Sequence, residues 1–433
     1  MAGRLGFRWR QLAHDLRTGL LFRPLLITGA LALFALILVE LERRGHIHPW
    51  RDGGWFFRND PAAAQTVLGA IAGSMMSVIS IVFSVMLVAL SLASVQFSPR
   101  ILGGFVRDRV SQQTLGVFVG TFTYCLIVMR AVSADPPWVA TWATAVGVLL
   151  ALICLLFLIY FIHHIATGIQ VNNIVERIAR ETEDVIDEVY PRTESPPAPL
   201  RTAIGLSVVA TRTGYLQLVD DAGLIALARR HRMVIHVSSE PGDFVSRGRE
   251  IAFLAGIDVP AQAAAACGEA FDLGPTRTMQ QDVAFGLRQL VDIGLKAISP
   301  AVNDPSTATI CIDRLGSLLA DIGPRHAGAR VLADGTTVLV VAPQPTFPEL
   351  VDLAFNQLRQ YGRGDLAVSI RMVSAIEHAA RSSSPEGSRR LLHHAELLRE
   401  GLSESFLPAD RARFDAVLQR LRDAHVADDG AVV

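Results

Sequence analysis

Residues 61–99 read PAAAQTVLGAIAGSMMSVISIVFSVMLVALSLASVQFSP and contain no charged side chain. A hydrocarbon core is crossed by about 20 helical residues, because an α-helix rises about 1.5 Å per residue. This stretch is therefore long enough to cross a bilayer and to continue into the interfacial and aqueous zones. It indicates a membrane protein.

Serines recur in this stretch with a period of seven residues. They are Ser77, Ser84, Ser91 and Ser98, and the same face is widened by Ser74, Ser80 and Ser94. A seven-residue period keeps side chains on one face of a helix. A hydroxyl stripe along a membrane helix either packs against protein or faces water. Two interpretations follow: a helix-packing seam, or a candidate pore lining formed by the four serines of the repeat.

Four runs of membrane length occupy the first 165 residues, and the remainder has the composition of a globular protein. The spans are expected at about 20–41, within 61–98, at about 113–132 and at about 138–165. Ten arginines near the span ends on one side and five on the other favour an inner-membrane protein with both termini in the cytoplasm.

Two of the expected spans contain a GxxxG pair. The pairs are Gly69 with Gly73 and Gly116 with Gly120. Small residues four apart allow two helix backbones to approach closely in a membrane. They are candidate helix-packing positions, and they also favour self-association through the spans.

The sequence predicts an α-helical membrane domain followed by a cytosolic α+β region. The expected parts are an amphipathic lead-in at 1–23, four spans within 24–165, an amphipathic helix and Pro-rich linker at 166–199, a small β module at 200–257, a mainly helical domain at 258–425 and a tail at 426–433.

The β module is expected to contain a bent strand pair at 207–220, a short helix at 221–232, a strand at 233–239 and a hairpin at 240–256. A tight turn is expected at Pro241–Gly242. This pattern resembles the small barrel-sandwich modules of biotinyl or lipoyl carriers and of efflux adaptor proteins. Such carriers modify a lysine at a hairpin tip, and the module contains no lysine. Only the shape of the module is therefore implied.

Beyond residue 259 the periodicity is mainly helical, with one hairpin at 329–343 whose Asp334–Gly335 turn supplies positive φ angles. Helices are expected at 279–297, 305–322, 347–362, 365–380, 385–400 and 408–423.

The densest polar cluster of the soluble part lies in QDVAFGLRQLVDIGLKAISPAVNDPSTATICIDRL, residues 281–315. Its candidate ligand-binding residues are Arg288, Asp292, Lys296, Asn303, Asp304 and Arg314. The first three are four apart and share one helix face, and Asp304 before Pro305 is a typical N-cap. The cluster is either an ion-pair ladder with a capped turn, or a site for a small anionic ligand at the helix N-terminus.

Composition and motifs exclude several function classes. The net charge of -1 argues against a nucleic-acid partner. The cysteines show no CxxC pair, so free thiols are expected and no metal site is predicted. The sequence lacks a nucleophile elbow, a P-loop, HExxH and GxGxxG, so we expect neither catalytic residues nor a cofactor. His163 and His164, at the end of the fourth span, are interpreted as interfacial anchors or pH sensors.

Several motifs together resemble one family. They are SVISIVFSVMLVALSLASVQFSPRIL, YFIHHIATGIQVNNI, RTGYLQLVD, RQLVDIGLKAISPAVNDPSTATICIDRL and QYGRGD. The chain is similar over nearly its whole length to the bacterial predicted inner-membrane proteins grouped as domain of unknown function 2254. The resemblance implies four spans followed by a cytosolic domain, and it implies no activity, substrate or site residue.

Two functions are compatible with these observations. The first is a homo-oligomeric channel or pore-like protein, in which the serine stripe lines the axis and the cytosolic domain gates or assembles it. The alternative is a non-conducting membrane-anchored sensor or scaffold, whose cytosolic domain binds a small anionic ligand or a protein. A transporter is disfavoured because no carboxylate is expected at the midplane of a span.

Overall fold

A computed structural model describes residues 22–45, 60–96, 108–134, 137–168, 170–190, 204–256, 259–325, 328–334, 337–402 and 406–429. These residues form two compact units that divide between Gln170 and Val171. Most of the expected lead-in, the Pro-rich stretch 191–199 and the last residues of the tail lie outside the described ranges.

The described residues of the first unit form four long helices. They are α2 (Phe22–Arg43), α3 (Pro61–Gln96), α5 (Arg109–Ala131) and α6 (Thr141–Gly168), with the short antiparallel strands β1 (Ser133–Ala134) and β2 (Pro137–Trp138) between the last two. All four are long and apolar enough to cross a membrane. The predicted four-span organisation is therefore confirmed.

Helix α5 is the most buried helix of this unit, and it packs against α2, α3 and α6. Phe118, Tyr124 and Val128 on α5 are fully buried. The other helices expose large apolar side chains, including Leu25 on α2 and Leu156 on α6. Outward-facing leucines are what a lipid environment requires, because the hydrocarbon core solvates apolar side chains.

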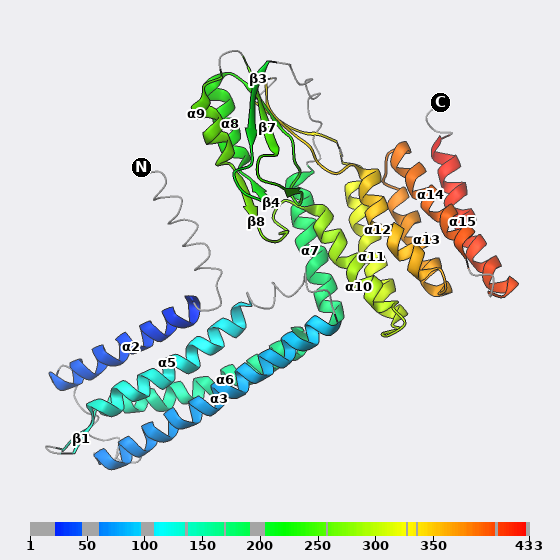
Figure 1. Cartoon of the computed structure of the whole chain (residues 1–433). Coiled ribbons are helices and arrows are strands. Elements are labelled where there is room, and N and C mark those ends of the chain that lie inside the picture. The colour runs from blue at the N-terminus through cyan, green and yellow to red at the C-terminus, as the bar shows by residue number, and fades with distance from the viewer. Residues whose placement is uncertain are drawn as a thin grey trace. The chain divides into compact units, whose positions relative to one another are not determined.

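In the part of the second unit that the structure describes, seven helices form an array. They are α7 (Val171–Val189), α10 (Val283–Ala297), α11 (Pro305–Ile322), α12 (Phe347–Gly362), α13 (Leu366–Ala380), α14 (Pro385–Gly401) and α15 (Pro408–Asp429), and Figure 1 shows them side by side. The apolar face of α7, which includes Ile174, Ile178 and Ile186, is buried, and α7 packs against α10 and α11. Helix α7 is thus an integral part of this unit.

The β part of the second unit contains two sheets. The larger has the order β3 (Gly205–Val209), β7 (Glu250–Ala255), β5 (Val234–Val237), β10 (Thr337–Ala342) and β9 (Arg330–Asp334). The smaller has the order β6 (Phe244–Val245), β4 (Gly214–Val219) and β8 (Phe271–Gly274). Among the described strands of the larger sheet, only β10 and β5 pair in parallel. Helices α8 (Asp221–His231) and α9 (Ala261–Gly268) share one hydrophobic core with strands of both sheets.

The strand pairing differs from the expected local hairpins. The two strands within 207–220 form, but β3 pairs with β7 and β4 pairs with β8, in different sheets. The turn at Pro241–Gly242 also forms, yet β6 and β7 after it pair with β4 and with β5, not with each other. The hairpin of β9 and β10 forms as expected, and it extends the sheet of the β module.

Candidate functional site

Helix α3 has one buried face and one exposed face within the single chain. The buried face consists of Ala64, Leu68, Ala72, Met75, Val82 and Ala89. Ser77, Ser84 and Ser91 of the predicted stripe are exposed. At about 100° per residue, Ser77 and Ser84 project opposite the buried Leu68 and Met75. Ser98 lies outside the described residues. The serine face is therefore not the surface that α3 uses to pack on α5 and α6.

Hydroxyl groups along this exposed face donate hydrogen bonds to the backbone of their own helix. Ser80 Oγ donates to the carbonyl oxygen of Met76 at 3.1 Å, and Ser84 Oγ donates to that of Ser80 at 2.8 Å. Ser74 Oγ donates to the carbonyl of Ile71 at 2.9 Å. A hydroxyl satisfied in this way costs little in a membrane, and its oxygen still offers acceptor lone pairs to water or to a second helix.

The two GxxxG pairs have different surroundings. A Cβ atom at Gly116 would lie 2.9 Å from Cα of Pro24, and one at Gly120 would lie 2.6 Å from Cδ1 of Leu31. These two glycines therefore allow α2 to approach α5. A Cβ at Gly69 would meet only Sδ of Met129, at 3.8 Å, and one at Gly73 would meet nothing within 4 Å. Gly73 thus lies on the open side of α3.

Polar contacts connect neighbouring helices at both ends of the bundle in the first unit. Near the end of α2, the Glu42 carboxylate accepts hydrogen bonds from the backbone N–H groups of Trp142 (3.3 Å) and Ala143 (2.7 Å), at the start of α6. At the opposite end of α6, Nε2 of His164 lies 3.0 Å from Oδ1 of Asp108, the N-cap of α5. His164 thus has a specific helix-end partner, and no described group of three His, Cys, Asp or Glu side chains could hold a metal ion.

Three of the six candidate ligand-binding residues each contact a different partner in the second unit. Nη1 of Arg288 donates to Oε1 of Gln357 on α12 at 2.6 Å, and Arg314 forms an ion pair with Glu176 on α7. Asp304 caps α11 by accepting from the backbone N–H of Thr307 at 3.1 Å.

The remaining members of this set lie near the turn between α10 and α11. Lys296 and Asn303 are exposed, Asn303 has a left-handed φ of 50°, and Asp292 is half-buried on the same helix face as Lys296. The capped turn of the first interpretation is present. The described contacts of the set do not converge on one point, so an anionic-ligand site here stays a prediction.

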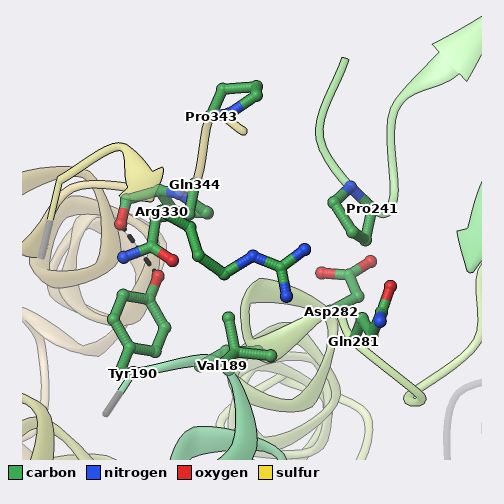
Figure 2. A pocket seen from close by; sticks show the side chains of 10 residues that line it. Val189, Tyr190, Pro241, Gln281, Asp282, Arg330, Pro343 and Gln344 are labelled. Carbon is green, nitrogen blue, oxygen red and sulfur yellow. Dashed lines mark hydrogen bonds between the residues drawn. The ribbon is translucent and has the colours of Figure 1, made fainter. Parts of the chain in front are cut away.

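A small pocket lies elsewhere, where the end of α7, the start of α10 and the β part meet (Figure 2). It is lined by Val189, Tyr190, Pro241, Gln281, Asp282, Val283, Arg330, Pro343, Gln344 and Pro345. Its volume is about 20 Å³. A space of this size holds about one water molecule, so it is too small for an organic substrate.

Most polar groups around this pocket have partners in the protein. The Tyr190 hydroxyl donates to the carbonyl of Pro345 at 2.8 Å, and Arg330 makes a two-pronged ion pair with Asp221. The carboxylate of Asp282 receives two hydrogen bonds from Arg277, both of 2.8 Å. A Cβ at Gly242, where φ is +98°, would lie 2.2 Å from Oδ2 of Asp282, so the tight turn at Pro241–Gly242 needs glycine.

Four carboxylates gather beside this turn. Burial raises the pKa of Glu240 to about 7, and the nearby charges of Asp243, Glu349 and Asp282 act in the same direction. Burial also raises the pKa of Asp282, although the Arg277 ion pair opposes that shift. The cluster therefore favours a bound proton near neutral pH. When its carboxylates are ionised, their mutual repulsion destabilises the folded turn.

We expect Glu240→Gln to stabilise the protein above neutral pH. The pKa of Glu240 in the folded protein, about 7, exceeds its ordinary value of 4.5, so the folded state binds the proton more tightly than the unfolded state does. Protonation of Glu240 therefore stabilises the fold fully below about pH 4.5, and this contribution is lost as the pH rises through about 7. Glu240 is partly exposed, so we expect a gain of only about 1 kcal/mol at pH 8. Thermal unfolding of the full chain from pH 5 to 8 measures it. Glu269→Gln, at an exposed position, is the control, and equal pH profiles for both variants would contradict the prediction.

Sequence reasoning missed Arg325, whose side chain is only 2% exposed. Its guanidinium donates to the carbonyl oxygens of Ile186 (3.2 Å) and Tyr190 (3.1 Å) at the end of α7, and it pairs with Asp187 and Asp321. No local pattern marks this residue, because α7 lies more than a hundred positions earlier in the chain.

Comparisons with known proteins agree with this architecture. Residues 17–378 match the family described as "Predicted membrane protein (DUF2254)". Uncharacterized proteins of Mycobacterium bovis and Mycobacterium tuberculosis are 32% identical to this chain over 343 residues. That alignment covers 74% of this chain and 65% of each relative, so the chain spans slightly less than two thirds of their length.

No solved structure matches the chain. These relatives are named only as uncharacterized proteins, so their names indicate no activity for this chain. The family match extends through the four membrane-length helices and into the helical array of the second unit. On the evidence of its four apolar helices, its second unit and this match, the chain belongs to the DUF2254 family of predicted membrane proteins.

Proposed function

We propose that this protein is a homo-oligomeric channel or pore-like protein of the bacterial inner membrane. Copies of α3 would surround a common axis with Ser77, Ser84 and Ser91 facing it. The main support for this proposal is that the serine face of α3 is exposed in the single chain, opposite the face that packs on α5 and α6. The second unit would gate or assemble the oligomer from the cytoplasm, with both termini on that side.

The period of the stripe supports an arrangement around an axis. A repeat of 3.5 residues per turn keeps one face of a helix directed at a supercoil axis over many turns. Small side chains permit close approach of neighbouring helices, and hydroxyls can be hydrated without carrying charge. A neutral hydroxyl lining would discriminate poorly between cations and anions.

The first test is single-channel conductance of the full-length protein in planar bilayers. We expect discrete openings from the wild type and their block by Ser84→Trp or Ser91→Trp. Phe83→Trp is the matched control, because Phe83 is exposed and projects about 100° around the helix from Ser84. The absence of openings from folded protein at several voltages and tensions would refute the pore axis. Equal block by Phe83→Trp would refute it as well.

The second candidate is a non-conducting anchored sensor or scaffold. It is favoured by the exposed Lys296, the chain's single lysine, which lies on the last turn of α10 before the capped start of α11. In this alternative the spans anchor and self-associate, and the cytosolic unit binds a small anionic ligand or a protein. A silent bilayer together with retained self-association would favour it over the channel.

A further inference from the structure

Large apolar side chains are exposed at three places in the helical array of the second unit. Among the described residues from 283 onward they are Val302 (46% exposed), Tyr361 (71%) and Leu407 (67%). Val302 lies in the turn between α10 and α11, Tyr361 on the last turn of α12, and Leu407 just before α15. Each is therefore at a helix end rather than on a helix face.

All three positions belong to the same end of the array. A Cβ at Gly362 would lie 3.6 Å from Cδ1 of Ile298, which brings the α12–α13 turn beside the α10–α11 turn. Helix α14 runs parallel to α12, because its early residue Arg390 pairs with Asp352 near the start of α12. The C-terminal end of α14 therefore lies at this end, as does the start of α15 along the lower edge of the array in Figure 1.

The same end is where α7 begins. Glu176, near the start of α7, pairs with Arg314 in the middle of α11, and the last residues of α7 contact Arg325 beyond the end of α11. The two helices are thus parallel, and the α10–α11 turn lies at the level of the first residues of α7. The membrane-length helix α6 ends at Gly168 and α7 begins at Val171. The three residue-to-residue intervals from Gly168 to Val171 extend over at most about 10 Å, so a short covalent connection links this end to the end of a span.

The side chains at this end have the chemistry of a membrane interface. Tyrosine, lysine and arginine are enriched where an apolar body meets hydrated headgroups, because each combines an apolar stem or ring with a polar tip. Lys296 and Arg363 are both exposed beside the apolar residues. The opposite end is polar, since the turn between α13 and α14 exposes Arg381, Ser382 and Ser384.

We propose that this end of the array rests in the headgroup layer of the phospholipid bilayer, with Val302, Tyr361 and Leu407 inserted and Lys296 and Arg363 among the phosphates. Both turns at this end, SPAVNDP (299–305) and QYGRGD (360–365), would then serve as membrane contacts. It goes beyond the proposed channel, and it requires neither conductance nor self-association. It would hold the second unit in one orientation to the membrane surface.

Site-directed fluorescence in proteoliposomes tests this contact on the full-length protein. All four native cysteines are buried, so a surface cysteine can be labelled selectively. Val302→Cys, Tyr361→Cys and Leu407→Cys would each carry a small fluorophore in vesicles of phosphatidylcholine and phosphatidylglycerol, with and without a headgroup nitroxide lipid. We expect several-fold stronger quenching at these positions than at the control Glu386→Cys, which is exposed on the first turn of α14 at the opposite end.

Aqueous iodide provides the complementary readout. We expect the three labels to be less accessible to iodide than the label at Glu386→Cys. Labels quenched no more by the nitroxide lipid than the control would overturn the proposal, provided that the protein is folded by its thermal transition. Shielding from iodide without nitroxide quenching would assign this end to a protein contact and would also overturn it.

Discussion

Arg325→Ala will lower the free energy of unfolding of the second unit by about 2–4 kcal/mol, because each buried acceptor that loses its donor costs about 1–3 kcal/mol. The alanine would leave the carbonyls of Ile186 and Tyr190 at the end of α7 without their guanidinium donor. Helix ends buried without partners are costly, because each orphan acceptor has been taken from water. Hydrogen exchange of the full-length protein will measure the loss as faster exchange at residues 186–190.

A matched control separates this role from that of an ordinary surface ion pair. Arg371 pairs with Asp313, and their side chains are 51% and 38% exposed. We expect Arg371→Ala to cost less than about 1 kcal/mol, because solvent screens such pairs. Arg325→Lys should fall between the two variants, since an ammonium group cannot reproduce the planar fork. Equal losses for Arg325→Ala and Arg371→Ala would show that Arg325 does not hold the end of α7.

Gly116→Leu will disrupt the contact between α2 and α5, with a loss of about 3 kcal/mol, at the upper end of the usual cost of overpacking. A Cβ atom added at Gly116 would lie 2.9 Å from the backbone Cα of Pro24 and 3.0 Å from Cδ1 of Ile27, and a backbone atom cannot rotate away as a side chain can. The two helices must therefore separate. Unfolding of the purified protein by sodium dodecyl sulfate in mixed micelles measures the effect as a shift to lower detergent fraction.

Gly73→Leu is the matched variant from the other GxxxG pair. A Cβ atom at Gly73 meets nothing within 4 Å, so the single subunit accommodates the larger side chain. We expect the detergent transition to stay near that of the wild type while cross-linking of the proposed oligomer decreases. Unchanged cross-linking would contradict the proposed placement of α3 at a contact between copies of the chain.

Helix positions were predictable because their signals are local. The expected bounds 305–322 and 347–362 match α11 and α12 residue for residue. Asp304 with Pro305, and Thr346 with Glu349, are capping pairs that act within one turn. The spans were equally predictable, because a run of about 20 apolar residues seldom occurs outside a membrane helix.

Strand pairing was not predictable, because it depends on partners that are distant in the chain. Strand β8 (Phe271–Gly274) was missed, since four residues carry little period-2 signal and its partner β4 lies more than fifty positions earlier. Because β8 was not predicted, the sequence indicated that the consecutive strands β3 and β4 pair with each other in one hairpin. The turn at Pro241–Gly242 could be located, but its contact with Asp282 depends on how α10 packs.

Site predictions were limited in the same way. Spacing correctly placed Arg288, Asp292 and Lys296 on one helix, yet the partner of Arg288 is on α12 and that of Arg314 is on α7. The two GxxxG pairs read alike in the sequence, and only packing distinguishes the filled pair on α5 from the open Gly73. The exposure of the serine face likewise depends on which side of α3 the other helices occupy.

The parallel pairing of β5 with β10 determines the order in which the chain can fold during synthesis. Ile235 and Val340 are register partners, so 105 further residues must leave the ribosome before β5 gains its second neighbour. At about 5–20 residues per second this takes roughly 5–20 s. During that interval β5 has an open edge while the four apolar helices are already made. Nascent chains are therefore most exposed to aggregation after membrane insertion, and a chaperone that covers unpaired strands would act there.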